Sequence, residues 1–396
     1  MLHRTAGLQL HLGLPRELGG PQLDSRPRLH GPRATVLGFH SRFGLGLRSV
    51  KTGKGIQLER ATRAQAGSSI LPAERSVGID CLRGIAILWV VAYHFLGVPA
   101  GTNGVLLFFA ISGYCISFST DSSKTAREFY AKRLGRLLPA LAISVVFITA
   151  VKHTFPDMID PARVPSWFDA VYTLVALPTL NIAKVHYIRP DGAFWSLEVE
   201  FQFYALCAFV MAVGLRKHLL PVVCIYCLVR FLLSNPSHPY SNDFFSFFIV
   251  GLSVATYQKG ETKAAYIGMT VAAVLELSHI LLGYSQPSAP IGWSRFLVLL
   301  ISTAALYAAS RYRAPAFLKP LALVGLVSYP LYLLHQDLGT MLFAWWGATL
   351  GDVLERGIGA FIFLIAAYGV YVFVERPWMK PITHLIAGRR LSAATA

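Results

Sequence analysis

The sequence predicts an all-α membrane protein: a bundle of about ten transmembrane helices, both ends cytoplasmic, with a disordered N-terminal segment. The 396 residues are 54% hydrophobic, and the mean hydropathy is +0.51. Only 14% of them are charged, whereas soluble domains carry about 25% charged residues. Apolar runs long enough to cross a bilayer recur between residues 80 and 374. These observations indicate that most of the chain lies in lipid.

The front of the chain, residues 1–75, differs from the rest. It holds 12 Lys/Arg against 4 Asp/Glu and shows no steady hydrophobic periodicity, so we expect it to be disordered. An organelle transit peptide and a mis-called start codon are the alternatives. The next methionine after Met1 is Met158, so a true start near Val77 would need a non-ATG codon. We assign this segment no function.

Ten apolar runs follow. A bilayer core is roughly 30 Å thick and takes about 20 apolar residues per helix. The predicted spans are 80–98, 104–119, 136–152, 195–214, 218–234, 243–258, 264–283, 292–310, 319–336 and 356–374. A further run, 168–183, is short and broken by Pro178, so we place it in an outer-face segment at about 153–194 that either stays at the surface or dips into the membrane.

Loop charges predict the orientation of the bundle. The loop after the second predicted span carries five basic residues between Lys124 and Arg136, and the loop after the first span carries no charge. Because basic loops stay in the cytoplasm, both ends of the chain are expected there, including a tail at 383–396. The net charge of +16 is explained in the same way, so we expect no nucleic-acid partner.

Five cysteines lie in or beside the apolar runs. Cys224 and Cys227 form a CxxC, a spacing used in redox and metal sites. No second pair and no nearby histidine or acid accompanies them, so they are interpreted as small buried apolar residues. We predict no metal site and no disulfide framework.

The first predicted span contains two ionisable residues in an apolar helix. Arg83 and His94 are eleven residues apart, which places them on one helical face about 16 Å apart along the axis. Ionisable residues inside a membrane usually face a cavity and mark function. A snorkelling anchor for Arg83 and an interhelical hydrogen bond for His94 are the alternatives. Histidine is also a general base near neutral pH.

Two further arginines stand where the third span leaves the cytoplasm. Arg133 and Arg136 are spaced i, i+3 on one face and are followed by Pro139. Two guanidinium groups at this spacing are suited to phosphates. Ordinary positive-inside charge is the alternative.

A polar stripe enters the predicted span 195–214 from the outer side. Trp195 suits the interface, and Ser196, Glu200 and Tyr204 follow at i, i+4, i+8 in an apolar helix. Glu200 is the deeper acid, for which a structural hydrogen bond is the alternative to function. Glu198 lies on another face, where solvent exposure explains it.

A second polar stripe lies in the ninth span. Ser328, Tyr332 and His335 are spaced i, i+4, i+7 and reach the outer end of the helix. Tyr332 and His335 are candidate substrate-binding residues. Belt residues at the membrane interface are the alternative.

Taken in order, six stretches resemble the acyltransferase-3 family of integral-membrane O-acyltransferases. They are IDCLRGIAILWVVAYH, GVLLFFAISGYCIS, FYAKRLGRLLPA, WSLEVEFQFY, LVGLVSYPLYLLH and VERP. The resemblance covers residues 77–382, which are expected to form the membrane domain. Glu198 stands where the family more often has a small residue.

The resemblance implies an acyl group, usually acetyl from acyl-CoA, transferred to a hydroxyl of a carbohydrate, glycolipid or glycosylated small molecule. It implies that His94 and Arg83 are catalytic, with Glu200 beside them, and that Arg133 and Arg136 bind the acyl-CoA donor. Trp195, Ser196, Tyr204, Tyr332 and His335 are the expected acceptor-binding residues. No resident cofactor is expected, and the expected location is a bacterial inner membrane or a plasma membrane.

The mechanism inferred from this pattern joins a cytoplasmic donor to an acceptor on the outer side. His94 either takes the proton of the acceptor hydroxyl or carries the acyl group briefly, with Glu200 or another acid orienting its ring. The alternative function is a transporter or flippase for an anionic or glycosylated solute, although the sequence shows no internal repeat of the kind such proteins use. A non-catalytic scaffold would not explain the aligned ionisable residues.

Overall fold

The structure is a computed structural model that describes residues 77–99, 101, 103–233, 244–282, 293–347 and 352–388. These residues belong to one compact unit, Leu71–Ala396. They are helical and contain no strand within the described ranges. The predicted disordered segment and residues 389–396 of the predicted tail lie outside them.

The described helices follow the predicted apolar runs. They are α2 (Val77–Leu96), α3 (Asn103–Asp121), α4 (Ala126–Thr154), α5 (Trp167–Ala176), α6 (Trp195–Ala212), α7 (Leu219–Leu232), α8 (Phe245–Gln258), α9 (Thr262–Leu281), α10 (Trp293–Arg311), α11 (Lys319–Leu326), α12 (Ser328–Leu334), α13 (Gln336–Trp346), α14 (Asp352–Val370) and α15 (Arg376–Ala387). A five-residue π-helix, Tyr371–Glu375, joins α14 to α15. Short 3₁₀ turns precede α6, α7 and α11.

Seven of the described helical segments are long and apolar enough to cross a membrane. The bent pair α11 and α12 makes an eighth if it is counted as one span, with an angle of 50° between its halves. Helices α7 and α8 occupy predicted spans but have 14 residues each, and both border residues 234–243, which the structure does not describe. The chain is therefore an all-helical, multi-pass membrane protein.

Helix α4 is longer than the predicted third span because it begins ten residues earlier. The Thr125 side chain caps it by accepting the Glu128 backbone N–H at 3.1 Å. Arg133 and Arg136 therefore lie within a helix of 29 residues rather than at its entrance. Pro139 lies inside this helix without ending it.

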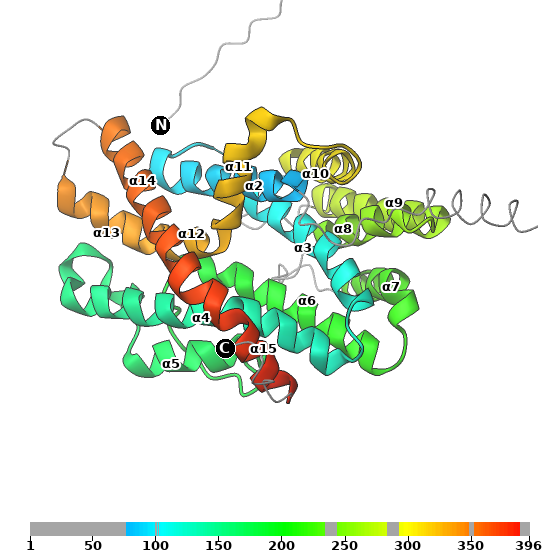
Figure 1. Cartoon of the computed structure of the whole chain (residues 1–396), viewed down its shortest axis with the longest axis horizontal. Helices are drawn as coiled ribbons and strands as arrows, with labels where there is room; N and C mark the ends of the chain where they lie inside the picture. Colours follow the sequence, from blue (N-terminus) through cyan, green and yellow to red (C-terminus); the bar gives the residue numbers. More distant parts are fainter. Residues whose placement is uncertain are drawn as a thin grey trace, which may run out of the picture. The chain divides into compact units, whose positions relative to one another are not determined.

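The segment between α4 and α6 runs back along α4. At one end the His153 ring stacks on Trp167 with centroids 5.7 Å apart, and at the other the Tyr130 hydroxyl donates to the Pro178 carbonyl at 2.6 Å. Tyr130 and His153 are separated by about 35 Å of helix. The segment expected at the outer face thus follows α4 along most of its length (Figure 1).

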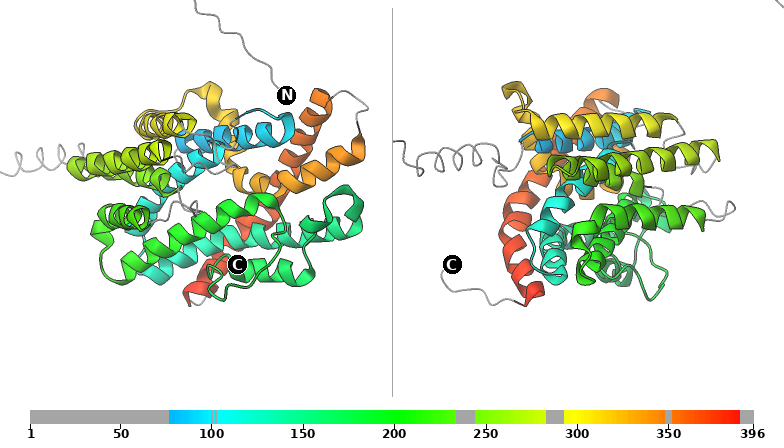
Figure 2. Two further views of the ribbon diagram at one scale, coloured as in Figure 1. Left: turned by 180° about the vertical axis from the view of Figure 1, so that it is seen from behind. Right: turned by 90° about the vertical axis from the view of Figure 1, so that its right-hand side faces the viewer.

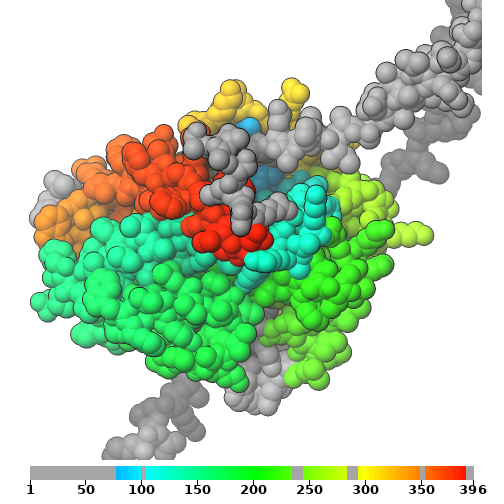
Figure 3. Space-filling view, turned by 60° about the horizontal axis from the view of Figure 1, so that its bottom comes forward, coloured from blue at the N-terminus to red at the C-terminus, as the bar shows by residue number. Residues whose placement is uncertain are grey.

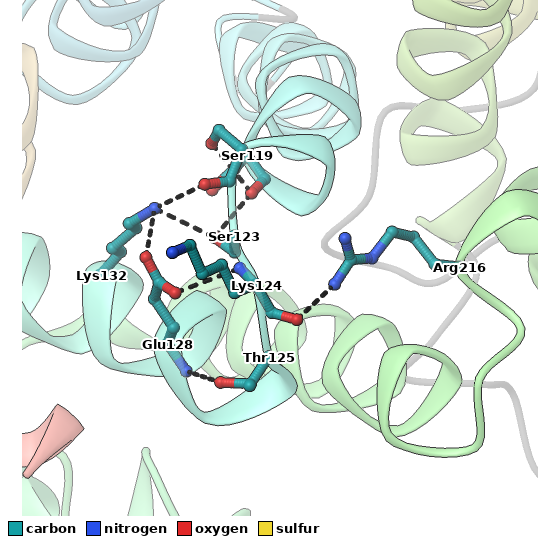
Figure 4. Close-up of polar contacts among 8 residues, drawn as sticks. Ser119, Ser123, Lys124, Thr125, Glu128, Lys132 and Arg216 are labelled. Carbon is teal, nitrogen blue, oxygen red and sulfur yellow. Dashed lines mark hydrogen bonds and ion pairs between the residues drawn. The ribbon is translucent and has the colours of Figure 1, made fainter.

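The basic loops meet at one end of the bundle, as Figure 4 shows for two of them. Lys132 pairs with Glu128 at 3.2 Å and bonds Ser123, and Arg216, beyond α6, donates to the Lys124 carbonyl at 2.9 Å. Lys259, beyond α8, reaches the end of α3. Segments far apart in sequence therefore share one positively charged end.

Helices α2 and α11 touch backbone to backbone. A side chain at Gly84 would collide with the Leu321 carbonyl, and one at Gly325 would collide with the Asp80 carbonyl. Such small-residue contacts hold membrane helices close together. This contact fixes Arg83, on α2, relative to the segment that leads into α12.

The C-terminal helices lie across the bundle. Figure 1 shows α14 and α15 as a long diagonal over α4 and α12, and the right-hand view of Figure 2 shows them along one side of the molecule. Helix α14 packs on α12, and α15 packs on α4. In the space-filling view α15 lies on the surface beside α4 (Figure 3). The diagonal brings Glu375 close to Arg136.

Candidate active site

A cavity of about 90 Å³ lies where α2, α3, α4, α6 and α12 meet. Seven of the ten predicted site residues line it: Arg83, Arg133, Arg136, Ser196, Glu200, Tyr204 and Tyr332. Its other polar lining residues are Ser112, Cys115, Ser328 and Tyr329. The polar stripes of two predicted spans therefore face one interior space.

Three arginines line this cavity. Arg83 donates to Asp80 at 3.0 Å and to the Cys115 sulfur at 3.2 Å. The Arg133 guanidinium lies 5.6 Å from the ring centre of Tyr204 and 5.8 Å from that of Phe129. Arg136 lies within electrostatic range of Glu375 and Glu200. Because the Arg133 Nε is buried and has no protein partner within the described residues, this arginine retains a donor for an anion.

Glu200 is held by hydroxyl groups within the cavity. It accepts hydrogen bonds from Ser112 at 2.8 Å and from Tyr204. No hydrogen bond links it to His94 within the described residues. The hydrogen bonds of Glu200 therefore do not support the expectation that it orients the His94 ring. They connect it instead to Tyr204, whose ring the Arg133 guanidinium contacts.

His94 lies outside the lining of the cavity, beside His335. The two ring centroids are 4.9 Å apart at an interplanar angle of 65°, and His335 in turn contacts Tyr332 with centroids 5.4 Å apart. Tyr332 lines the cavity. A row of three rings therefore leads from the cavity to His94.

Trp195 also lies outside the lining of the cavity. Its indole packs against Phe244 and Phe109, with ring centroids 5.1 and 6.5 Å apart. It was predicted from its place at the entrance of α6, where the helix starts. The geometry shows an aromatic packing contact there.

A buried charge cluster adjoins the histidines, and none of its members was predicted as a site residue. The Asp337 carboxylate accepts from Lys152 at 2.6 Å and from Arg163, and the Asp337 backbone N–H donates to Asp191 at 3.0 Å. Lys152 and Asp191 are completely buried, and Asp337 is 1% exposed. Asp337 lies only two residues beyond His335, which is the one sequence signal that could have found the cluster.

Burial and the neighbouring Asp337 carboxylate raise the pKa of Asp191 to about 7. Both effects disfavour a second negative charge in this cluster. Asp191 also accepts the Ala193 backbone N–H at 2.8 Å, at the turn that starts α6. The protonation state of Asp191 therefore affects the hydrogen bond that fixes the turn before α6.

A second polar cavity lies on the opposite face of α6 and includes Glu198. Arg189 donates to both Glu198 oxygens, at 2.6 and 2.9 Å, and the Tyr187 hydroxyl donates to the same carboxylate at 3.0 Å. Asn181, His186 and Gln202 complete its polar lining. Glu198 is therefore an anchor for the segment between α5 and α6 rather than a solvated surface charge.

Comparison with known proteins gives one family model, Acyl_transf_3, described as an acyltransferase domain, which matches residues 76–375. The chain is 31% identical over 156 residues to the "Putative peptidoglycan O-acetyltransferase YrhL" of Bacillus subtilis, covering 35% of this chain and 24% of the relative. It is 33% identical over 154 residues to the "Putative membrane-bound transacylase BcsY" of Komagataeibacter xylinus, covering 37% and 39%.

The match to the "O-acetyltransferase OatA" of Staphylococcus aureus is longer. It extends over 347 residues at 24% identity and covers 76% of this chain and 57% of the relative. The chain thus spans between about a quarter and just over half the length of these relatives. No solved structure gives a significant match.

Proposed function

Because the chain belongs to the acyltransferase-3 family of membrane O-acyltransferases, we propose that it transfers an acetyl group from acetyl-CoA to a hydroxyl of a carbohydrate, glycolipid or glycosylated small molecule. The observation that carries the proposal is the cavity that Arg83, Arg133 and Arg136 line together with Glu200 and Tyr332. A cavity lined by arginines within an apolar bundle suits a charged donor.

The proposed topology has ten spans with both ends in the cytoplasm, in the inner or plasma membrane. The shared basic end of the bundle, with Lys132, Arg216 and Lys259, supports the cytoplasmic placement of that end. Acetyl-CoA is made in the cytoplasm, so its phosphates would approach Arg133 and Arg136 from there. The arginine side chains would bind them through charge-assisted hydrogen bonds.

The proposed chemistry takes place at His94. The acceptor oxygen attacks the thioester carbonyl carbon while His94 accepts the hydroxyl proton. The carbon–sulfur bond then breaks, and His94 passes that proton to the departing sulfur, so that CoA leaves as the thiol. Tyr332 lines the cavity and its ring contacts His335, so in the proposed mechanism this side chain moves to let the acetyl group reach His94. In this mechanism Glu200 lies in the cavity that binds the donor and does not orient His94.

The acceptor is proposed from the relatives. Two of them carry names that specify O-acetyl transfer, in one case to peptidoglycan. A carbohydrate of the cell envelope is therefore the proposed acceptor class. Comparison of envelope glycans from cells with and without the gene by mass spectrometry would show a lost acetyl-sized mass.

The direct test uses the full chain in lipid nanodiscs with labelled acetyl-CoA and an envelope glycan fraction. His94→Ala is expected to lower acceptor-dependent CoA release by at least about 100-fold, because a positioned base contributes roughly 10²–10⁴-fold. His153→Ala is the matched control, since His153 stacks on Trp167 at the end of the same bundle. Full activity in the His94 variant would refute the proposal.

A further inference from the structure

The hydrogen bond of His335 to its own helix determines which of its nitrogens carries the proton. His335 Nδ1 lies 2.8 Å from the Tyr332 backbone carbonyl oxygen, which can only accept a hydrogen bond. Nδ1 is therefore the protonated nitrogen. In the neutral ring that leaves Nε2 as a bare acceptor.

The acceptor nitrogen of His335 is buried without a protein partner. His335 is 0% exposed, and Nε2 has no hydrogen bond within the described residues. Leaving a buried acceptor without a hydrogen bond is energetically unfavourable. Its persistence here points to a partner that it acquires during the reaction.

His94 is the neighbour with hydrogen-bonding capacity to spare. Two aromatic rings contact His335, those of Tyr332 and His94. The Tyr332 hydroxyl is already engaged with Ser196 at 2.6 Å and with the Ala193 carbonyl at 3.0 Å. The His94 ring makes no hydrogen bond to any described residue, and its centroid lies 4.9 Å from that of His335.

The charge cluster fixes the position of His335. The chain changes helix at His335, where α12 ends and α13 begins, and Asp337 in the first turn of α13 is bound by Lys152 and Arg163. Since all but Arg163 in this cluster are nearly or fully buried, the start of α13 has little freedom to move. The imidazole of His335 is thus held at a defined place beside His94.

We propose that His335 is the positioning residue of His94, accepting through Nε2 the N–H of the His94 ring and so leaving the other His94 nitrogen bare toward the acceptor hydroxyl. The arrangement is the one in which a base is itself oriented by a third group. It replaces the role first expected of Glu200. This inference rests on the proposed transferase function and on His94 as its base.

The test compares variants that differ in which ring nitrogen they imitate. Gln at position 335 places an amide oxygen near the Nε2 position, Asn reaches only as far as Nδ1, and Phe keeps the ring volume without any polar atom. In nanodiscs, His335→Gln is expected to retain kcat within about 10-fold, whereas His335→Asn and His335→Phe lower it by roughly 10²–10⁴-fold. The KM for acetyl-CoA should stay unchanged in all three, since the donor site is separate.

The outcomes separate the two proposals. A His335→Phe variant as active as His335→Gln, or more active, overturns the positioning role, because volume alone would then suffice. Loss of activity in His94→Ala together with full activity in all three His335 variants overturns the positioning role and leaves the transferase proposal standing. Full activity in His94→Ala removes both.

A stability control excludes simple unfolding as the cause. Glu276 and Arg295 form an equally buried ion pair between α9 and α10, at 2.9 and 3.0 Å, outside both cavities. Glu276→Gln is expected to lower the thermal midpoint while leaving kcat within about twofold. If it lowers kcat as much as His335→Asn does at an equal loss of stability, the His335 effect is not specific and the inference is wrong.

Discussion

The hydroxyl oxygen of Tyr332 lies 2.6 Å from that of Ser196, where the arginine-lined cavity comes closest to the two histidines. The Tyr332 hydroxyl also bonds the Ala193 carbonyl at 3.0 Å, so the ring is held on two sides. Tyr332 therefore links the cavity proposed for the donor to the pair of histidines that includes the proposed base. In the proposed mechanism, its position controls whether acetyl-CoA can reach His94.

Tyr332→Phe is expected to weaken this closure. Without the hydroxyl the ring loses both hydrogen bonds, each contributing about 1 kcal/mol. Water should then reach the thioester more often, and hydrolysis of acetyl-CoA without acceptor should rise several-fold. Tyr329→Phe is the matched control, because Tyr329 lines the same cavity but bonds the Leu137 carbonyl. Equal hydrolysis in the two variants would contradict a closing role.

Arg133→Gln is expected to raise the KM for acetyl-CoA by about 10-fold with a smaller effect on kcat, because it removes one charge-assisted contact worth about 1.5 kcal/mol. Arg133→Lys should behave similarly, since an ammonium group cannot reproduce the planar fork. Lys132→Gln is the control: Lys132 is the neighbouring residue, partly exposed and paired with Glu128. An unchanged KM in Arg133→Gln would argue against a donor site here.

Lys152→Met is expected to destabilise the protein strongly. The substitution removes one cation from a buried cluster and leaves the Asp337 carboxylate without its buried ion-pair partner. Such a loss costs about 3–5 kcal/mol in comparable sites. Thermal unfolding in detergent measures the change. Lys132→Met, which breaks an exposed pair, should cost less than about 1 kcal/mol. A double variant, Lys152→Met with Asp337→Leu, is expected to recover part of the loss, because no unpaired buried charge from that pair remains.

The raised pKa of Asp191 predicts a pH dependence of stability. The folded protein holds this proton up to about pH 7, whereas the unfolded chain releases it near pH 4, so the folded state binds more protons between these values. The contribution is therefore fully present below about pH 4 and is lost as the pH rises through 7. Between pH 5 and pH 8 the thermal midpoint should fall. Asp191→Asn should flatten this part of the curve; an unaltered slope would contradict the assignment.

Much of the architecture could be predicted from the sequence because apolar length is a direct physical requirement of the bilayer. Each predicted span contains a helix in the described part of the chain. The bend before α12 was missed, although Pro330 in its first turn removes a backbone donor and disfavours a continuous helix. The length of α4 was also missed, because its first turns are charged and resemble a loop when judged by hydropathy alone.

The site was only partly readable for a different reason. Residues at helical spacing on one face, such as Ser196, Glu200 and Tyr204, must point in one direction, and they do line one cavity. The Lys152–Asp337 pair joins residues 185 positions apart, and no local periodicity carries that information. The same holds for the Asp191–Asp337 bond. Their pairing depends on how α4, α6 and α13 pack.

The backbone contact between Gly84 and Gly325 limits where the molecule can flex. Because α2 and α11 pack backbone to backbone at these glycines, we expect a movement of Tyr332 to pivot at the kink after Leu326, where the two halves of the broken span meet at 50°. The half beyond that pivot carries Tyr332 and ends at His335. Substrate entry and alignment of the proposed base would then both depend on bending at this kink. A bulkier residue there would slow substrate entry and misalign His94 in the same variant.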